Sequence, residues 1–185
     1  MSKALVVYAN GSEDMEVTSV ASILDRGGVK VTRAAVAAPG LREVTLSHGM
    51  HVVCDCNIAD CAQDSYDIIV IPGGMQGSEN CANSSELISL LKAQQQAGRY
   101  IGAICAAPGL VLAKHGLVGN AQATGYPGCT DGITNYTGAG ATIDVAHKLV
   151  TGKGPAFSID FGLACLEVLV SADVLAKVKA GMLYE

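Results

Sequence analysis

The chain has 185 residues, of which 50% are hydrophobic and 16% are charged, and this size and composition predict a single domain, residues 1–185, with one main core. Lys and Arg number 12 against 17 for Asp and Glu, a net charge of −5 without any basic block, so we expect no surface for a nucleic-acid backbone. The longest hydrophobic run, residues 101–113, is interrupted by glycine and proline and is too short to span a membrane. No signal-peptide cleavage pattern follows the first hydrophobic segment. We therefore expect a cytoplasmic protein without a membrane partner.

The first half of the chain alternates predicted strands with predicted helices. The strands are expected at residues 3–9, 29–37 and 66–71, and the helices at residues 14–26 and 84–97. Ser84 is the expected N-cap of the second helix, and a glycine follows the end of each helix. Between the second and third strands, residues 43–47 and 50–55 alternate in polarity like an antiparallel excursion.

The second half continues the alternation and then becomes rich in glycine and threonine over residues 119–152. The expected strands are residues 100–104, 141–145 and 148–151, and the expected helices are residues 106–115, 156–170 and 172–184. Strands that alternate with helices at this spacing predict an α/β fold with right-handed connections, in which helices cover both faces of a parallel sheet.

The seven cysteines predict neither a disulfide framework nor a zinc site. Their number is odd and no C-x-x-C pair occurs, so reduced thiols and no bound metal are expected. Cys54 and Cys56 would share one face of a strand and could form a soft-metal pair. A lone C-x-C without a supporting histidine is more typical of core packing.

Three turns are expected to meet at one edge of the sheet. Residues 10–16, 72–74 and 104–107 each follow a predicted parallel strand, and ligands of open parallel sheets bind outside the carboxyl ends of the strands. Glu16, the backbone of Gly74, and Cys105 should therefore converge there.

Cys105 lies between a strand and small residues that permit the tight turn of a nucleophile elbow. The free N–H groups and dipole of a following helix would lower the pKa of the thiol, which favours a thiolate at neutral pH. The alternative is that Cys105 is a small buried hydrophobic residue, the commonest role of a free cysteine.

Glu16 also has two interpretations. It could complement the helix dipole from solvent together with Glu13 and Asp14. If it points into the crevice instead, burial and a neighbouring thiolate would raise its pKa and keep it protonated beside Cys105. Gly73 and Gly74 could serve the turn alone, or they could let the backbone approach a ligand.

Four segments together carry a family resemblance. They are GSEDMEV at residues 11–17, IVIPGG at 69–74, AICAAP at 103–108 and GKGPAFSIDFGL at 152–163. In these motifs, and over essentially its whole length, the chain resembles the DJ-1/ThiJ/PfpI superfamily and is most similar to its DJ-1 and YajL branch. The resemblance implies a flavodoxin-like three-layer sandwich with a mostly parallel central sheet, and a homodimer.

The resemblance also implies the roles of the site residues. Cys105 would be the reactive nucleophile and Glu16 its protonated partner, with the N–H groups of Gly74 and Ala106 as oxyanion donors. Gly73, Tyr126 and His48 would line the pocket. Many relatives carry a histidine where this chain has Tyr126, and close relatives carry an arginine where it has His48.

These features favour one function and leave an alternative open. The first is a cofactor-independent glyoxalase or deglycase that acts on a small aldehyde, methylglyoxal, or on its early protein adducts. The alternative is a redox sensor or chaperone in which the same cysteine is oxidised to sulfinate. Without a histidine beside Cys105, a peptidase triad is disfavoured, and a glutaminase would need a His–Glu pair. Acidic residues after the first strand disfavour a phosphate-binding flavodoxin-like module.

Overall fold

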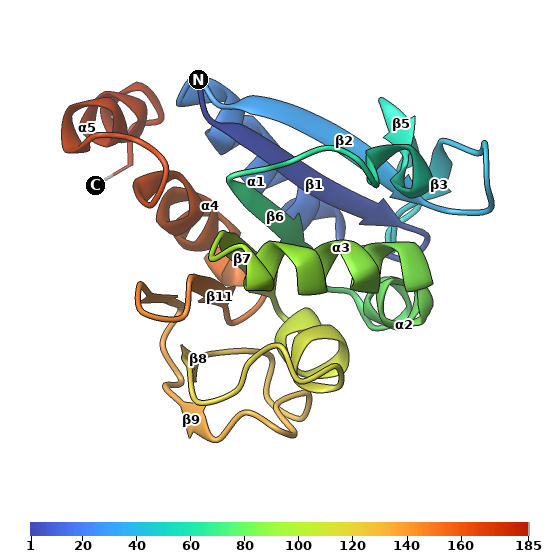
Figure 1. Ribbon diagram of the computed structural model, residues 1–185. Coiled ribbons are helices and arrows are strands. Elements are labelled where there is room, and N and C mark those ends of the chain that lie inside the picture. Colours follow the sequence, from blue (N-terminus) through green and yellow to red (C-terminus); the bar gives the residue numbers. More distant parts are fainter. Residues whose placement is uncertain (185) are drawn as a thin grey trace.

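The computed structural model describes residues 1–184 and contains a seven-stranded sheet between two layers of helices (Figure 1). The sheet comprises β1 (Lys3–Ala9), β2 (Lys30–Val36), β5 (Cys56–Asn57), β6 (Ile68–Ile71), β7 (Tyr100–Ile104), β10 (Ala141–Asp144) and β11 (Leu149–Gly152). Their order is β10-β11-β7-β6-β1-β2-β5, and every neighbouring pair is parallel except β10 with β11.

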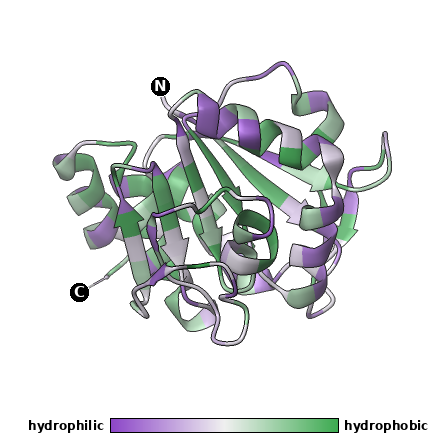
Figure 2. Cartoon of the chain, turned by 60° about the horizontal axis from the view of Figure 1, so that its bottom comes forward, coloured by the Kyte–Doolittle hydropathy of each residue, from purple (hydrophilic) through white to green (hydrophobic). Residues whose placement is uncertain are grey.

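Hydrophobic residues on both faces explain why the central strands are parallel and buried. Along β1, Val6 and Tyr8 belong to one hydrophobic cluster, whereas Leu5 and Val7 belong to the other. Residues on alternate sides of a strand face opposite layers, so each face of β1 needs its own cover of helices. Figure 2 shows hydrophobic colour along the central strands and a mixture of hydrophobic and hydrophilic colour along the helices around them.

The helices divide between the two faces. They are α1 (Asp14–Arg26), α2 (Met75–Asn83), α3 (Ser85–Gln96), the π-helix η2 (Pro108–Ala113), α4 (Ser158–Glu167) and α5 (Ala172–Gly181). Helices α1 and α4 pack together on one face, whereas α3 and η2 contribute to the cluster on the other. Gly162 of α4 allows this close packing, because a Cβ there would lie 2.6 Å from Ile23 of α1. The predicted three-layer α/β sandwich is confirmed.

The smaller elements lie outside the main alternation. They are the hairpin strands β3 (Glu43–Thr45) and β4 (His51–Val53), the short pair β8 (Gln122–Ala123) and β9 (Asn135–Tyr136), and the 3-10 helices η1 (Ile58–Cys61) and η3 (Pro155–Phe157). The antiparallel pairing of β3 with β4 confirms the predicted excursion. None of the helices described for residues 1–184 is both long and hydrophobic enough to cross a bilayer.

The helix predicted at residues 106–115 is present after Cys105, but its type differs from the expected α-helix. The chain forms a six-residue π-helix from Pro108 instead, and the N–H of Lys114 donates to the carbonyl of Gly109, five residues earlier. Gly109 packs directly on the backbone of Cys129. A short π-helix after a candidate nucleophile is typical of functional sites.

Helix α2 was not expected from the sequence. Its residues, MQGSENCAN, show no hydrophobic stripe of helical spacing, and its N-cap Gly74 makes no side-chain cap hydrogen bond. Tertiary packing stabilises it instead, because Ser78 and Cys81 are fully buried. Cys54 and Cys56 do not share a strand as expected: Cys54 follows β4, and Cys56 begins β5.

Candidate active site

Cys105 occupies a sharp turn directly after β7. Its φ angle is 63°, in the left-handed region that non-glycine residues rarely adopt. Two hydrogen bonds hold this conformation: the Cys105 N–H donates to the Gly152 carbonyl at 2.9 Å, and the Tyr126 N–H donates to the Cys105 carbonyl at 2.7 Å. Such a backbone costs about 1–3 kcal/mol, and it places the thiol at the carboxyl edge of the sheet.

Glu16 reaches the same point from the first turn of α1. Glu13 is the N-cap of this helix, and its carboxylate accepts the Glu16 N–H at 2.8 Å. The Glu16 side chain is fully buried, and its Oε2 accepts the Gly73 N–H at 2.7 Å. Its Oε1 has no hydrogen-bond partner among the described residues, and the carboxyl lies beside the Cys105 thiol, since a Cβ at Gly73 would lie 2.7 Å from Glu16 Oε2 and 3.0 Å from Cys105 Sγ.

Glycine is required where the carboxyl and the thiol meet. A Cβ at Gly73 would lie 2.5 Å from the Cβ of Cys105 and 2.7 Å from Glu16 Oε2. Gly74 has a φ angle of 80°, and a Cβ there would lie 2.2 Å from the Gly11 carbonyl oxygen. The two glycines therefore allow the strand ends to approach closely, which is more than a turn alone requires.

Two backbone donors complete the arrangement. The backbone N–H groups of Gly74 and Ala106 oppose the increase in the pKa of the Cys105 thiol. One belongs to the N-cap of α2 and the other to the residue directly after Cys105. Their expected role as oxyanion donors stays a prediction.

Burial controls the charge of the pair. It raises the pKa of Glu16 to about 7, against the lowering effect of the Gly73 hydrogen bond. Burial also raises the pKa of Cys105 to about 12; the charge of Glu16 adds to this increase, and the N–H groups of Gly74 and Ala106 oppose it. Two neighbouring buried groups do not both ionise readily, so the pair retains one proton well above pH 7.

The structure therefore corrects the expected thiolate. The helical turn that follows Cys105 begins at Ala106, whose carbonyl accepts the Leu110 N–H at 2.9 Å, yet burial outweighs the backbone N–H groups near the thiol. Part of the increase in the Cys105 pKa comes from the negative charge of Glu16, and this part disappears when Glu16 is protonated. When the shared proton moves to Glu16, the repulsion ends and the carboxyl becomes a hydrogen-bond donor. Thiolate is then reached by proton transfer within the pair.

The raised pKa of Glu16 predicts that stability falls as pH rises. The ordinary pKa of 4.5 applies in the unfolded chain and about 7 in the fold, so the folded state holds the extra proton. This contribution is complete below pH 4.5 and is lost as pH rises through 7. As the pH rises from 4.5 through 7, we expect the free energy of unfolding, measured in urea, to fall by about 3 kcal/mol more in the wild type than in Glu16→Gln. The same dependence of the unfolding free energy on pH in both proteins would contradict this.

Tyr126 and His48 lie at the margins of the pair. The Tyr126 backbone N–H donates to the Cys105 carbonyl. The Tyr126 residue is 48% exposed, and its ring lies against Gly154. The His48 side chain is 72% exposed, and its Nδ1 lies 3.2 Å from Asp14 Oδ2. The structure gives neither side chain a contact with Cys105, so their roles in a pocket stay predictions.

The other histidines are engaged elsewhere. His51 contacts Thr45, His115 contacts the Ala82 carbonyl, and His147 pairs with Asp144. Within residues 1–184 no histidine is placed in hydrogen-bonding contact with Cys105.

One group of side chains has the composition of a metal site. Glu13, Asp14 and His48 bring three potential ligand atoms within 4.8 Å of one another. Hydrogen bonds account for the same geometry, because the His48 N–H and the Ser47 hydroxyl donate to Asp14 Oδ2 at 2.9 and 3.0 Å and hold the pKa of Asp14 below its usual range against the effect of burial. Asp14 therefore already has hydrogen-bond partners within the protein.

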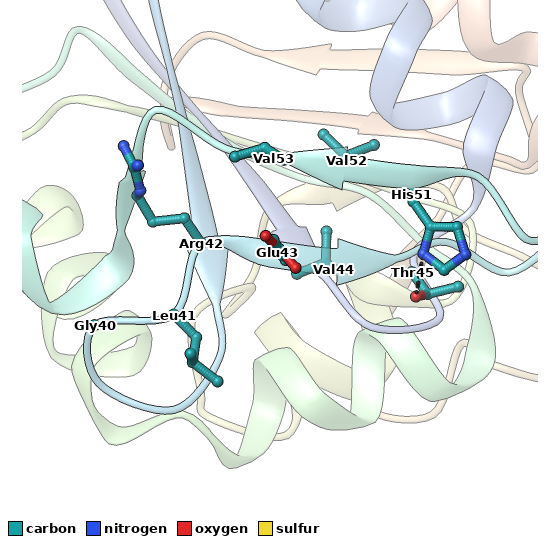
Figure 3. Close-up of a pocket in the computed structure, with 9 residues that line it drawn as sticks. All are labelled: Gly40, Leu41, Arg42, Glu43, Val44, Thr45, His51, Val52 and Val53. Atoms are coloured by element: carbon teal, nitrogen blue, oxygen red, sulfur yellow. Dashed lines mark hydrogen bonds between the residues drawn. The ribbon is translucent and has the colours of Figure 1, made fainter.

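A hollow on the surface is separate from the Cys105–Glu16 pair. It has a volume of about 920 Å³ and follows the β3–β4 hairpin, where Thr45 and His51 face each other (Figure 3). Its lining residues are 40–45 and 51–53, and neither Cys105 nor Glu16 is among them. The chemistry of the pair thus lies at the strand ends and outside this hollow.

Sequence reasoning did not identify the support that Gly152 provides. Its carbonyl accepts the Cys105 N–H, and a Cβ at Gly152 would lie 2.8 Å from Ile104 and 2.9 Å from Phe161. A glycine inside a buried strand usually marks such a close approach, and this was the available signal.

Comparison with known proteins places the chain among similar sequences. The model of the DJ-1/PfpI family matches residues 2–168. Protein dj-1beta of Drosophila melanogaster is 37% identical over 99% of this chain and 98% of its own length. Glutathione-independent glyoxalase DJR-1.2 of Caenorhabditis elegans is 31% identical over 91% of this chain and 88% of its own length. Protein DJ-1 homolog B of Arabidopsis thaliana is 36% identical over 88% of this chain, which spans 37% of that longer protein.

The fold agrees with the sequence comparison. The structure of oxidized Toxoplasma gondii DJ-1 matches with a TM-score of 0.94 and 35% identity, over 100% of this chain and 99% of that chain. The family model covers most of the chain, and the match to the Drosophila protein extends over nearly all of both sequences. The chain belongs to the DJ-1/PfpI family.

Proposed function

We propose that this protein is a cofactor-independent glyoxalase or deglycase that acts on methylglyoxal or its early protein adducts. The observation that carries the proposal is the buried Cys105–Glu16 pair, whose side chains meet at Gly73, where a Cβ would lie 2.5 Å from the Cβ of Cys105 and 2.7 Å from Glu16 Oε2. A protein of Caenorhabditis elegans that is named as a glutathione-independent glyoxalase supports it at 31% identity.

Addition of the thiol to the aldehyde is the first step. The shared proton moves to Glu16, and the Cys105 sulfur attacks the aldehyde carbon of methylglyoxal. A C–S bond forms, the carbonyl electron pair moves to oxygen, and the N–H groups of Gly74 and Ala106 stabilise the negative charge. Glu16 then returns its proton to that oxygen, which gives a neutral hemithioacetal.

Proton transfer between adjacent carbons completes the reaction. As a carboxylate, Glu16 removes the proton from the former aldehyde carbon, a C=C bond forms, and the carbonyl electron pair moves to the ketone oxygen, which gives an enediolate. The proton of the neighbouring hydroxyl then passes to that oxygen. Return of a proton to the neighbouring carbon gives a lactoyl thioester. Water hydrolyses the thioester and releases lactate and the Cys105 thiol. The reaction adds one water to methylglyoxal, and no electrons leave the substrate.

The test is to measure lactate formed from methylglyoxal by the purified protein without added thiol. In D₂O, the expected lactate carries deuterium at carbon 2, because the proton on Glu16 exchanges with solvent. Lactate formation no faster than in buffer alone would refute the enzymatic proposal. For the deglycase activity, the same protein is incubated with a thiol compound pretreated with methylglyoxal, and recovery of the free thiol is measured.

A redox sensor or chaperone is the second candidate. One observation favours it, namely the similarity to a Toxoplasma gondii DJ-1 structure described as oxidized. Oxidation of Cys105 to sulfinate would place oxygens beside Glu16 and the donors of Gly74 and Ala106. Mild peroxide should then add two oxygens to Cys105, and the oxidised protein alone should suppress aggregation of a heated client protein. Equal suppression by reduced protein would reject this candidate.

We also propose that the chain forms a homodimer through the face shared by α1 and the β3–β4 hairpin. Met15 is 55% exposed, Met50 is 47% exposed and Val53 is 66% exposed, and the His48 N–H donates to Asp14, which ties the hairpin loop to α1. Exposed hydrophobic residues on one face are typical of an interface.

A matched pair of variants tests the dimer. Val53→Glu is expected to convert a dimer to a monomer in sedimentation analysis, because a charge would be buried without a partner. Val145→Glu is the control, since Val145 is 59% exposed and follows β10 at the opposite edge of the sheet. A monomeric wild type, or loss of the dimer in both variants, would contradict the proposed face.

A further inference from the structure

Two cysteines outside the active site meet at the edge of the sheet. The sulfur atoms of Cys56 and Cys61 lie 3.5 Å apart. Cys56 begins β5, the edge strand next to β2, and Cys61 ends the 3-10 helix η1. The S–S bond of a disulfide is about 2.05 Å long, so a small movement of the two side chains would join them.

The local structure holds this dithiol in place. Asn57 and Asp60 form a capping box that begins η1 directly after Cys56. The Asn57 amide also donates to the carbonyls of Ala37, Ala38 and Leu41 at 3.3, 3.0 and 2.7 Å. These hydrogen bonds fix strand β5 and helix η1 against the segment after β2, and so keep the two thiols next to each other.

The two thiols differ in access to solvent. Cys56 is half-buried, whereas Cys61 is 1% exposed. The Cys61 thiol donates to the Asn57 carbonyl at 3.8 Å. A small oxidant can therefore reach Cys56 first, and the buried Cys61 is placed to react with the oxidised sulfur of Cys56.

We propose that Cys56 and Cys61 form a second redox site, a dithiol that hydroperoxides convert to an intramolecular disulfide. The thiolate of Cys56 attacks a peroxide oxygen, the O–O bond breaks, and Cys56 becomes a sulfenic acid while the other oxygen leaves as water or an alcohol. The sulfur of Cys61 then attacks the sulfenic sulfur, and water leaves. Two thiols lose two electrons and two protons, and one hydroperoxide accepts both.

This inference does not depend on the proposed function of Cys105. Burial raises the pKa of Cys56 to about 12, with the neighbouring Cys61 adding to the effect, so Cys56 is a slow nucleophile at neutral pH. We therefore expect the dithiol to close under sustained exposure to peroxide. Closure is reversible by added thiol, in contrast to oxidation of a single cysteine beyond the sulfenic acid.

The sequence allows a direct test. Cleavage before aspartate separates Asp55–Ala59, DCNIA, from Asp60–Gln63, DCAQ. Each peptide carries one of the two cysteines, and Cys54 falls in a third peptide. The protein is treated with hydrogen peroxide, its free thiols are blocked, and it is digested without reductant. We expect DCNIA joined to DCAQ by a disulfide, with a mass two hydrogen atoms below the sum of the two peptides. Added dithiothreitol should separate them.

Variants of the same protein make the result decisive. In Cys61→Ser the joined peptides should disappear, and Cys56 should carry added oxygen instead. In Cys105→Ala the joined peptides should persist, which separates this site from the active-site candidate. The proposal is overturned if wild-type protein contains oxidised Cys105 while Cys56 and Cys61 remain free thiols, or if Cys56 is joined to Cys54 instead.

Discussion

Replacing Cys105 with alanine is expected to reduce lactate formation from methylglyoxal by at least about 1,000-fold. The variant has no sulfur to form the hemithioacetal, so the N–H groups of Gly74 and Ala106 and the carboxyl of Glu16 have no covalent intermediate to act on. The measurement is the initial rate of lactate formation at equal protein concentration. The fold should persist, because alanine retains the Cβ and the hydrogen bonds of the elbow are made by the backbone.

Cys129→Ala is the matched control for this prediction. Cys129 is 8% exposed and Cys105 is 7% exposed, so both substitutions remove one buried sulfur. The Cys129 thiol contacts the sulfur of Met75 at 3.6 Å, and the structure gives it no contact with Glu16. We expect its lactate rate to stay within about twofold of wild type, as is usual for substitutions away from the chemistry. Equal losses in both variants would mean that the effect is structural.

Replacing Glu16 with glutamine is expected to lower lactate formation by about 100- to 10,000-fold, the usual range for loss of a general acid or base. Glutamine has nearly the same shape and can still accept the Gly73 N–H. It cannot move a proton between the two substrate carbons. The variant should therefore lose both the proton transfer that ionises the Cys105 thiol within the pair and the later transfer between the substrate carbons, so the rate at which deuterium-labelled lactate forms in D₂O should fall with the overall rate.

The alkylation rate of Cys105 against pH separates this role from a structural one. In the wild type the pair keeps one proton above about pH 7, so the thiolate fraction and the rate should level off there. In Glu16→Gln no carboxyl competes for the proton, and the rate should continue to rise by about tenfold per pH unit while thiolate remains the minor form. Profiles of the same shape would contradict a shared proton.

Glu13→Gln is the corresponding control. Glu13 is the N-cap of α1 and lies three residues before Glu16. Glutamine keeps an oxygen that can accept the Glu16 N–H, so the start of the helix should remain intact. We expect a small change in lactate formation and an alkylation profile that still levels off. Loss of the plateau in this variant would assign the effect to Glu13 and not to the pair.

Much of the architecture could be predicted because its signals are local. The hydrophobic run before the first turn, residues 3–9, and the buried run ending at Ile71 predict strands from their own side chains. Ser84 was expected as an N-cap, and its hydroxyl accepts the Leu87 N–H at 3.2 Å. Helix α2 has no such signal, since its buried positions become visible only when β1 and η2 pack against it.

The sequence by itself determined which residues follow the strand ends, and thus that Glu16, Gly74 and Cys105 lie at one edge of the sheet. Only the tertiary structure decided the charge of the pair and the contact between Cys56 and Cys61. The turns and strands depend on residues close together in the chain. A pKa depends on the water removed and on charges from other elements, and here burial outweighs the backbone N–H groups near the Cys105 sulfur.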